Sequence, residues 1–309
     1  AMSQSPKKER CQWRFRVLSF GLANAPSYFQ RLMDLILTGL TYTACLVYLD
    51  DVIIYSRSFE EHVERLGVVF DRLQKANLKL KASKCHLFQR RVGFLGHVIS
   101  EGGIECDPEK IRAVENWPRP KSITETRAFC GLASYYRTFV QGFAEIARPL
   151  HELTRKGARF EWTQRQEDAF NELKRRLTTA PILGTPRDEG RFVLDTDASD
   201  LALGAILHQE QDGELRVIAY ASRALSAAER NYCTTRKELR AVIFGLKKFR
   251  QHVLARDLTI RTDHAALSHL QRAPEPVGQQ SQYLDFLSEF SFVIQHRPGS
   301  SGRNSDAMS

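Results

Sequence analysis

Two adjacent aspartates, Asp50 and Asp51, are the most conspicuous chemical feature of the sequence. They lie inside the apolar, β-branched run CLVYLDDVIIY at 45–55. Carboxylates in such surroundings are costly to desolvate unless a charge compensates them, and a divalent cation is the natural compensator. The alternative interpretation is a β-hairpin that turns at the carboxylates, and for a lone Asp-Asp pair it is the more frequent one.

Four further acidic residues are widely separated along the chain. They are Asp197 in TDAS, Glu238 in KEL, Asp263 in TDH and Asp306 in NSDA. Each of them, taken alone, is best explained as a helix cap or a solvated acid. Asp195 competes with Asp197, because residues two apart on one strand face the same side of a sheet.

The elements around Asp50 and Asp51 are predicted from hydrophobic spacing. Apolar residues after Pro26 recur at helical intervals, and the segment 45–55 is expected to form a strand pair. Ser58 and Glu61 form a capping box before a further helix. Strands are expected at 14–18, 78–80 and 94–100. We predict that the stripe buried by the helix after Ser58 is Val63, Leu66, Phe70 and Leu73.

After Gly102 the sequence pattern changes to short predicted helices separated by prolines, which indicates a small helical domain over 102–180. The stretch 180–190 holds two prolines and two glycines and is the best linker candidate. Strands are then predicted near 191–196, 203–209, 215–221, 257–262 and 290–295, with a long helix near 226–254. The expected fold class is therefore multidomain, α/β and α+β, ending in a mixed sheet with helices.

Composition narrows the function classes. The chain has 309 residues and a net charge of +9, of which +7 falls on residues 1–100, a bias that fits contact with a polyanion. A hydrophobic share of 42% excludes a largely disordered chain. No apolar run is long enough for a transmembrane span or a secretory signal, so no membrane partner is expected. The six cysteines contain no C-x-x-C pair, which argues against a zinc site or a disulfide framework.

The run YLDD at 48–51, preceded by FGLANAPSYFQ at 20–30, resembles the Y-x-D-D and substrate-loop motifs of reverse transcriptases of gypsy-type LTR retrotransposons. The segments 77–80, 84–85, 94–97 and 103–104 resemble the end of the palm and the primer-contacting hairpin of that family. The resemblance implies that Asp50 and Asp51 are catalytic metal ligands. It implies nucleic-acid contacts from Tyr48, Gly21, Asn24, Gln30, Lys79, Lys81, Lys84, Gly96 and His97.

The phrases TDAS, KEL, TDH and NSDA resemble the four carboxylates of the ribonuclease H domain fused to these polymerases. The resemblance implies that Asp197, rather than Asp195, acts with Glu238, Asp263 and Asp306 as catalytic metal ligands. Phosphodiester hydrolysis with two cations needs such a nest of oxygen ligands. The implied cofactor is Mg²⁺, with Mn²⁺ as a substitute.

The sequence departs from the family pattern in two places. The family carries a third catalytic aspartate and a fingers subdomain upstream of the FGLxNAP motif, whereas the only acids here before Asp50 are Glu9 and Asp34. Polymerisation is therefore expected to be catalytically incomplete in this chain. Asp306 is followed by three residues, so we expect it to be weakly held. His264 suits either product release or a helix cap, and the sequence favours the cap.

The expected organisation is a partial reverse transcriptase palm at 1–101, a helical thumb and connection at 102–180, and a ribonuclease H domain at 181–309. The expected reaction is hydrolysis of the RNA strand of RNA–DNA hybrids, with RNA-directed DNA synthesis implied for the complete parent protein. The alternative is a non-catalytic nucleic-acid-binding or structural subunit. Expected partners are the hybrid, a primer-template, and a second copy or a complementary N-terminal polymerase piece. The expected location is intracellular, in a cytoplasmic retroelement particle or the nucleus.

Overall fold

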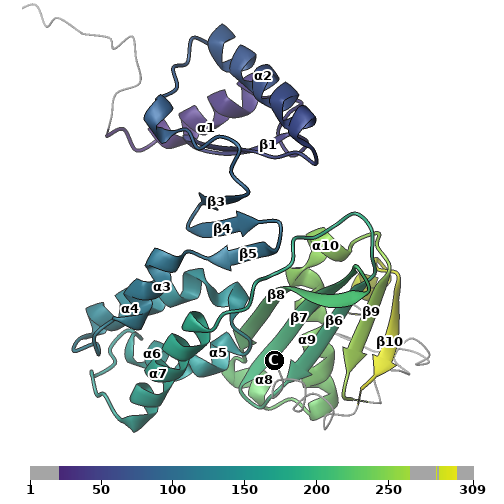
Figure 1. Ribbon diagram of the computed structural model, residues 1–309. Coiled ribbons are helices and arrows are strands. Elements are labelled where there is room, and N and C mark those ends of the chain that lie inside the picture. The colour runs from purple at the N-terminus through teal and green to yellow at the C-terminus, as the bar shows by residue number, and fades with distance from the viewer. Residues whose placement is uncertain (1–20, 265–282, 284, 298–309) are drawn as a thin grey trace, which may run out of the picture. The chain divides into compact units, whose positions relative to one another are not determined.

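The computed structural model describes residues 21–264, 283 and 285–297. The chain divides into two compact units, Ala1–Gln89 and Arg90–Ser309, and each is described by itself (Figure 1). Both combine helices with strands, which confirms the predicted mixed, multidomain fold class. No helix among the described residues is long and apolar enough to cross a membrane. The strand predicted at 14–18 lies outside the described residues.

The first unit packs two helices against a β-hairpin. Helix α1 (Ala25–Ile36) precedes strands β1 (Cys45–Tyr48) and β2 (Asp51–Ile54), which pair antiparallel. Helix α2 (Phe59–Lys75) and the short 3₁₀ helix η1 (Ala82–Lys84) follow. The predicted hairpin is confirmed, with Tyr48 opposite Asp51 across its turn. The buried core is formed by Met33, Leu37, Cys45, Val69 and Leu73.

Helix α2 begins as predicted, because the Ser58 hydroxyl accepts a hydrogen bond from the Glu61 amide at 3.2 Å. Its buried stripe differs from the predicted one. The buried residues are Leu66, Val69 and Leu73, whereas Val63 is 47% and Phe70 39% exposed. The strand predicted at 78–80 is also wrong, because this segment pairs with no strand and turns back onto α2 through its first amide.

The second unit begins with the three-stranded antiparallel sheet β3 (Arg91–Phe94), β4 (His97–Ser100) and β5 (Gly103–Cys106). A helical part follows, as predicted from the prolines. It comprises α3 (Pro108–Glu115), α4 (Ile123–Tyr135), η2 (Arg137–Phe139), α5 (Phe143–Ile146), α6 (Arg148–Leu153) and α7 (Gln164–Thr178). Its core combines aliphatic and aromatic residues, and the centroids of the Phe129 and Phe170 rings lie 4.6 Å apart.

The remainder of the second unit is a mixed five-stranded sheet. In chain order its strands are β6 (Phe192–Ala198), β7 (Ala202–Gln211), β8 (Glu214–Ala224), β9 (Leu258–Thr262) and β10 (Phe292–His296). Their spatial order is β10-β9-β6-β7-β8, and β9 is parallel to both β6 and β10. All five match the predicted strands.

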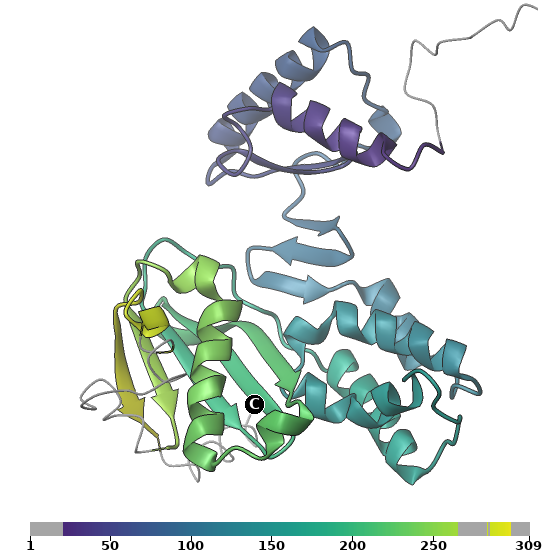
Figure 2. The same cartoon turned by 180° about the vertical axis from the view of Figure 1, so that it is seen from behind.

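One long helix crosses one face of this sheet (Figure 2). The single helix predicted near 226–254 is instead three: α8 (Ala227–Arg230), α9 (Thr234–Lys248) and α10 (Arg250–Val253). A capping box between Ser226 and Glu229 starts α8, and non-helical backbone at Cys233 precedes α9. Helix α9 buries Leu239, Val242 and Leu246 against the strands.

The predicted linker is anchored at its centre. Leu183 is 4% exposed and pairs with Ile104 of β5 through two backbone hydrogen bonds of 2.8 and 2.9 Å. Val217 and Tyr220 of β8, an edge strand of the five-stranded sheet, pack against the core of the helical part. The helical part and the five-stranded sheet are therefore joined by a continuous packed interface.

Candidate active site

Three of the four predicted ribonuclease H carboxylates come together in the structure. Asp197 lies near the end of β6, Glu238 on the second turn of α9 and Asp263 directly after β9. One oxygen of each lies within 4.8 Å of the others. The strands β6 and β9 are parallel neighbours, so their carboxyl ends meet at the same edge of the sheet. Asp306 lies outside the described residues.

Glu238 is the buried member of this carboxylate cluster, with 3% of its surface exposed. Its Oε1 accepts a hydrogen bond from the Ala198 amide at 3.2 Å. Its Oε2 is buried and has no hydrogen-bond partner among the described residues. An unpaired buried carboxylate oxygen is costly, and coordination of a cation removes that cost. The donor set consists of hard oxygens, which suits Mg²⁺ or Mn²⁺.

The electrostatics of the carboxylate cluster favour the same interpretation. Burial, followed by the charges of Asp263 and Asp197, raises the pKa of Glu238 to about 8. Burial and the charge of Asp263 also raise the pKa of Asp197 above its ordinary value. A divalent cation close to Glu238 and Asp197 would stabilise the charged forms of both carboxylates at once.

This shift predicts how the stability of the metal-free protein depends on pH. Because the folded-state pKa of Glu238 exceeds its unfolded value, its stabilising effect is complete below about pH 4.5 and is lost as pH rises through about 8. We expect the unfolding temperature measured in a chelator to decrease as the pH rises from about 4.5 to about 8. Glu238→Gln should flatten the fall, and Mg²⁺ should offset it most strongly at high pH.

The matched control for this measurement is Glu214→Gln, which changes an exposed glutamate at the start of β8. Its unfolding temperature should follow the unaltered chain across the whole pH range. An equally steep fall in Glu238→Gln would show that another group causes the pH dependence.

Asp195 does not join the carboxylate cluster. Its two oxygens accept hydrogen bonds from Arg261 at 2.5 and 2.6 Å, and His208 Nδ1 lies 3.6 Å away. A bidentate guanidinium pair of this kind neutralises the carboxylate and fixes its direction. The structure therefore supports Asp197 over Asp195 as the cluster member.

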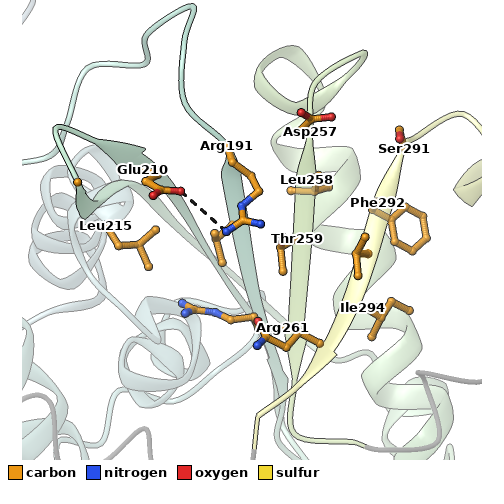
Figure 3. A pocket seen from close by; sticks show the side chains of 14 residues that line it. Arg191, Glu210, Leu215, Asp257, Leu258, Thr259, Arg261, Ser291, Phe292 and Ile294 are labelled. Atoms are coloured by element: carbon orange, nitrogen blue, oxygen red, sulfur yellow. Dashed lines mark ion pairs between the residues drawn. The ribbon is translucent and has the colours of Figure 1, made fainter.

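Arg261 also lines a groove of about 790 Å³ on the sheet (Figure 3). The groove is bordered by Arg191, which pairs with Glu210 at 3.9 Å, and by Thr259 and Val293. None of the three clustered carboxylates lines it. The groove and the carboxylate cluster are thus separate features of the domain.

Two residues of α9 next to Glu238 were not predicted from the sequence. Lys237 is 7% exposed, and its Nζ donates to Asp200 Oδ1 at 2.7 Å. The Thr235 hydroxyl lies 2.8 Å from His264 Nε2. The sequence signal was available, because residues three apart on a helix share a face, and Thr235 precedes Glu238 by three.

Asp50 and Asp51 are exposed, so the desolvation argument for them is wrong. They lie at a tight turn in which Leu49 has a left-handed backbone, with φ of 55°. Gln30 of α1 holds this turn: its Oε1 accepts from the Leu49 amide at 2.5 Å, and its Nε2 donates to Val47 O at 3.4 Å. The described part of the first unit brings no third acidic ligand to the pair.

The other predicted nucleic-acid contacts of the first unit lie at its surface. Tyr48 is 54% exposed at the hairpin end. Its hydroxyl-bearing ring therefore remains available to a ligand. The predicted contacts Gly21, Asn24, Lys79, Lys81 and Lys84 are exposed as well. Their role in binding stays a prediction.

Gly96 lies in the turn of the β3-β4 hairpin in the second unit, and His97 is the first residue of β4. Tyr136 donates its hydroxyl to Gly96 O at 2.6 Å, and Tyr135 donates to Leu95 O. The His97 ring stacks on Tyr135 at 5.3 Å. Burial lowers the pKa of His97, which favours the neutral form of its ring. The structure thus assigns packing contacts to His97, and its predicted contact with nucleic acid stays untested.

Two family models match separate parts of the chain. Residues 2–99 match the family described as reverse transcriptase (RNA-dependent DNA polymerase). Residues 162–260 match the RNase H-like domain found in reverse transcriptase. The Pol polyprotein of transposon 297 from Drosophila melanogaster is 41% identical over 94% of the chain. The chain thus carries a reverse transcriptase domain and an RNase H-like domain of reverse transcriptases, and its homologues are polyproteins of LTR transposons.

A relative from a second organism also matches nearly the whole chain. The Tf2-3 transposon polyprotein of Schizosaccharomyces pombe is 34% identical over 96% of it. The chain spans 27% of the length of the transposon 297 polyprotein and 23% of the Tf2-3 polyprotein. It therefore corresponds to one part of these polyproteins.

The fold is shared with a viral protease-reverse transcriptase. The foamy viral protease-reverse transcriptase solved with dsDNA has a TM-score of 0.75 and 25% identity, over 90% of this chain and 60% of that one. The same viral enzyme solved with an RNA/DNA hybrid has a TM-score of 0.76 and 24% identity, over 90% of this chain and 39% of that one.

Proposed function

We propose that the second unit of this chain hydrolyses the RNA strand of RNA–DNA hybrids in the presence of Mg²⁺, with Mn²⁺ as a substitute. The observation that carries the proposal is the convergence of Asp197, Glu238 and Asp263 within 4.8 Å at one edge of the sheet. Structural acids are normally paired with cations or exposed to water, whereas Glu238 is buried with one oxygen unpartnered among the described residues.

The chemistry follows from what these side chains hold. Divalent cations held by Asp197, Glu238 and Asp263 would supply activation of water and stabilisation of the leaving oxygen. The hydrogen bond from the Ala198 amide holds Oε1 of Glu238 in place. Because the carboxylate then cannot rotate freely, Oε2 keeps one direction. Asp197 and Asp263 are exposed and therefore accessible to a nucleic-acid strand, whereas Glu238 is buried. Asp306 is proposed as a fourth ligand on the resemblance alone.

The remaining assignments extend this proposal to the whole chain. We assign residues 1–101 to a partial palm, 102–180 to a helical thumb and connection, and 181–309 to the ribonuclease H domain. The partners would be hybrid and primer-template nucleic acid, with DNA synthesis belonging to the complete parent protein. A second copy or a complementary polymerase piece would be the protein partner. A retroelement particle in the cytoplasm, or the nucleus, would be the location.

The test is cleavage of a labelled RNA–DNA hybrid by the purified chain. We expect Mg²⁺-dependent cleavage of the RNA strand, abolished by a chelator, with RNA duplex and DNA duplex of the same sequence left intact. The two duplexes are matched controls, because they present the same bases without the hybrid backbone. Binding of the hybrid without cleavage would overturn the enzymatic proposal and support the non-catalytic subunit instead.

A further inference from the structure

A side-chain contact joins the two backbone segments that carry Glu238 and Asp263. Thr235 Oγ1 on the first turn of α9 lies 2.8 Å from His264 Nε2. Thr235 precedes Glu238 by three residues and shares its helix face, and His264 directly follows Asp263. The contact therefore spans the gap between helix and strand end at the position where the two carboxylates meet.

The backbone around Asp263 is held by two further hydrogen bonds. The His264 amide donates to Thr262 Oγ1 at 3.2 Å. His296 on β10 donates from Nε2 to the carbonyl oxygen of Asp263 at 2.9 Å, since a carbonyl only accepts. These bonds fix the peptide of Asp263 to the sheet. The Thr235–His264 contact differs from them, because it ties the same segment to the helix.

The Thr235–His264 contact opposes electrostatic repulsion among the clustered carboxylates. Asp263 lies within 4.8 Å of two other carboxylates, and its charge raises the pKa of both. Glu238 is held by the buried core of α9, whereas Asp263 is exposed at a strand end. Repulsion in the metal-free state therefore acts mainly to displace the Asp263 segment. A hydrogen bond from the helix opposes that displacement.

We propose that Thr235 and His264 form a positioning pair, which holds Asp263 at the separation from Glu238 that divalent-cation binding requires. The inference rests on the proposed function for its biological use. Neither residue contacts the reacting atoms. Both act through the position of Asp263, so their loss weakens cation binding and leaves the chemical step intact once the cation is bound.

The experiment measures Mn²⁺ affinity by paramagnetic-resonance titration in the full chain. We compare Thr235→Val, which removes the hydroxyl, with Thr235→Ser, which retains it. We expect about five-fold weaker Mn²⁺ binding in Thr235→Val, the equivalent of about 1 kcal/mol for one net hydrogen bond. Thr235→Ser should restore the affinity. His264→Ala should match Thr235→Val, and the double variant should be no weaker than either.

The matched control is Thr234→Val, which makes the same substitution at the neighbouring exposed position of α9. It should retain the Mn²⁺ affinity of the unaltered chain, and metal-free unfolding temperatures establish that every variant is folded. Hybrid cleavage at saturating Mg²⁺ should stay within about two-fold in Thr235→Val, because lost metal affinity is overcome by mass action.

The outcomes separate this inference from the proposed function. Unchanged Mn²⁺ affinity in both Thr235→Val and His264→Ala would overturn the positioning role, even if the unaltered chain cleaves the hybrid. An equal loss in Thr234→Val would overturn it as well. Weakened Mn²⁺ binding in a chain that cleaves no hybrid would uphold the positioning pair and overturn the proposed function alone.

Discussion

Asp197→Asn should reduce Mg²⁺-dependent cleavage of an RNA–DNA hybrid by at least about 100-fold, since loss of residues that merely support metal ligands already costs 10–100-fold. The amide keeps the shape of the side chain but removes its negative charge and one acceptor oxygen. Asp197 lies within 4.8 Å of both Glu238 and Asp263, so the whole carboxylate cluster loses affinity for the cation. The measurement is the initial rate of release of labelled RNA.

The matched control is Asp212→Asn, in the turn between β7 and β8 of the same sheet. Asp212 has a left-handed backbone with φ of 54°, which asparagine adopts readily. It pairs with Arg187 at 2.9 Å in an exposed salt bridge, which contributes little to stability. Its cleavage rate should equal that of the unaltered chain. If Asp197→Asn cleaved as fast as this control, the assignment of the carboxylate cluster would be wrong.

Gly103→Ala should destabilise the second unit by roughly 3 kcal/mol or more, through backbone strain and steric overlap. Gly103 has φ of 131°, a conformation that side chains disfavour, and a Cβ there would lie 2.1 Å from the carbonyl oxygen of Leu183. That carbonyl accepts the hydrogen bond from Ile104. We expect the substitution to separate β5 from the segment at Leu183 and to lower the unfolding temperature measured by calorimetry.

The neighbouring Gly102→Ala provides the control for this substitution. A Cβ at Gly102 would meet Ser100 Oγ at 3.6 Å, an ordinary van der Waals contact. Its effect should stay within about 0.5 kcal/mol, as for most surface substitutions. Equal unfolding temperatures for the two variants would show that the contact at Leu183 is not formed in solution.

Local signals predicted much of the fold. The Ser58 cap and the strand pair at 45–55 depend on residues close in sequence, and both are present. The face that α2 buries could not be predicted, because several apolar stripes fit its sequence. Packing against α1 and the hairpin selects the stripe containing Val69, and leaves Val63 outside it. A choice among equivalent stripes is made by tertiary contacts.

The carboxylate cluster could be predicted in part for similar reasons. Spacing alone left Asp195 and Asp197 as equals on one strand. The difference lies in Arg261, 66 residues away from Asp195, which neutralises that carboxylate across the sheet. The prediction that Asp50 is buried was wrong for a different reason. Its apolar sequence neighbours suggested burial, whereas the tight turn at Leu49 exposes it to solvent. Asp195 is decided by a partner that is remote in sequence, and Asp50 is decided by the geometry of the backbone turn.

The packing of β8 against the helical part also bears on inheritance. Val217 and Tyr220 face the core of the helices, and the Ser222 hydroxyl accepts a hydrogen bond from the Ala144 amide at 2.8 Å. Recombination between related retroelements could join the helical part of one to the five-stranded sheet of another at residue 180. The two packing surfaces would then not fit each other. The helices and the five-stranded sheet should consequently be exchanged as one evolutionary module, with crossovers disfavoured in the proline-rich stretch at 180–190.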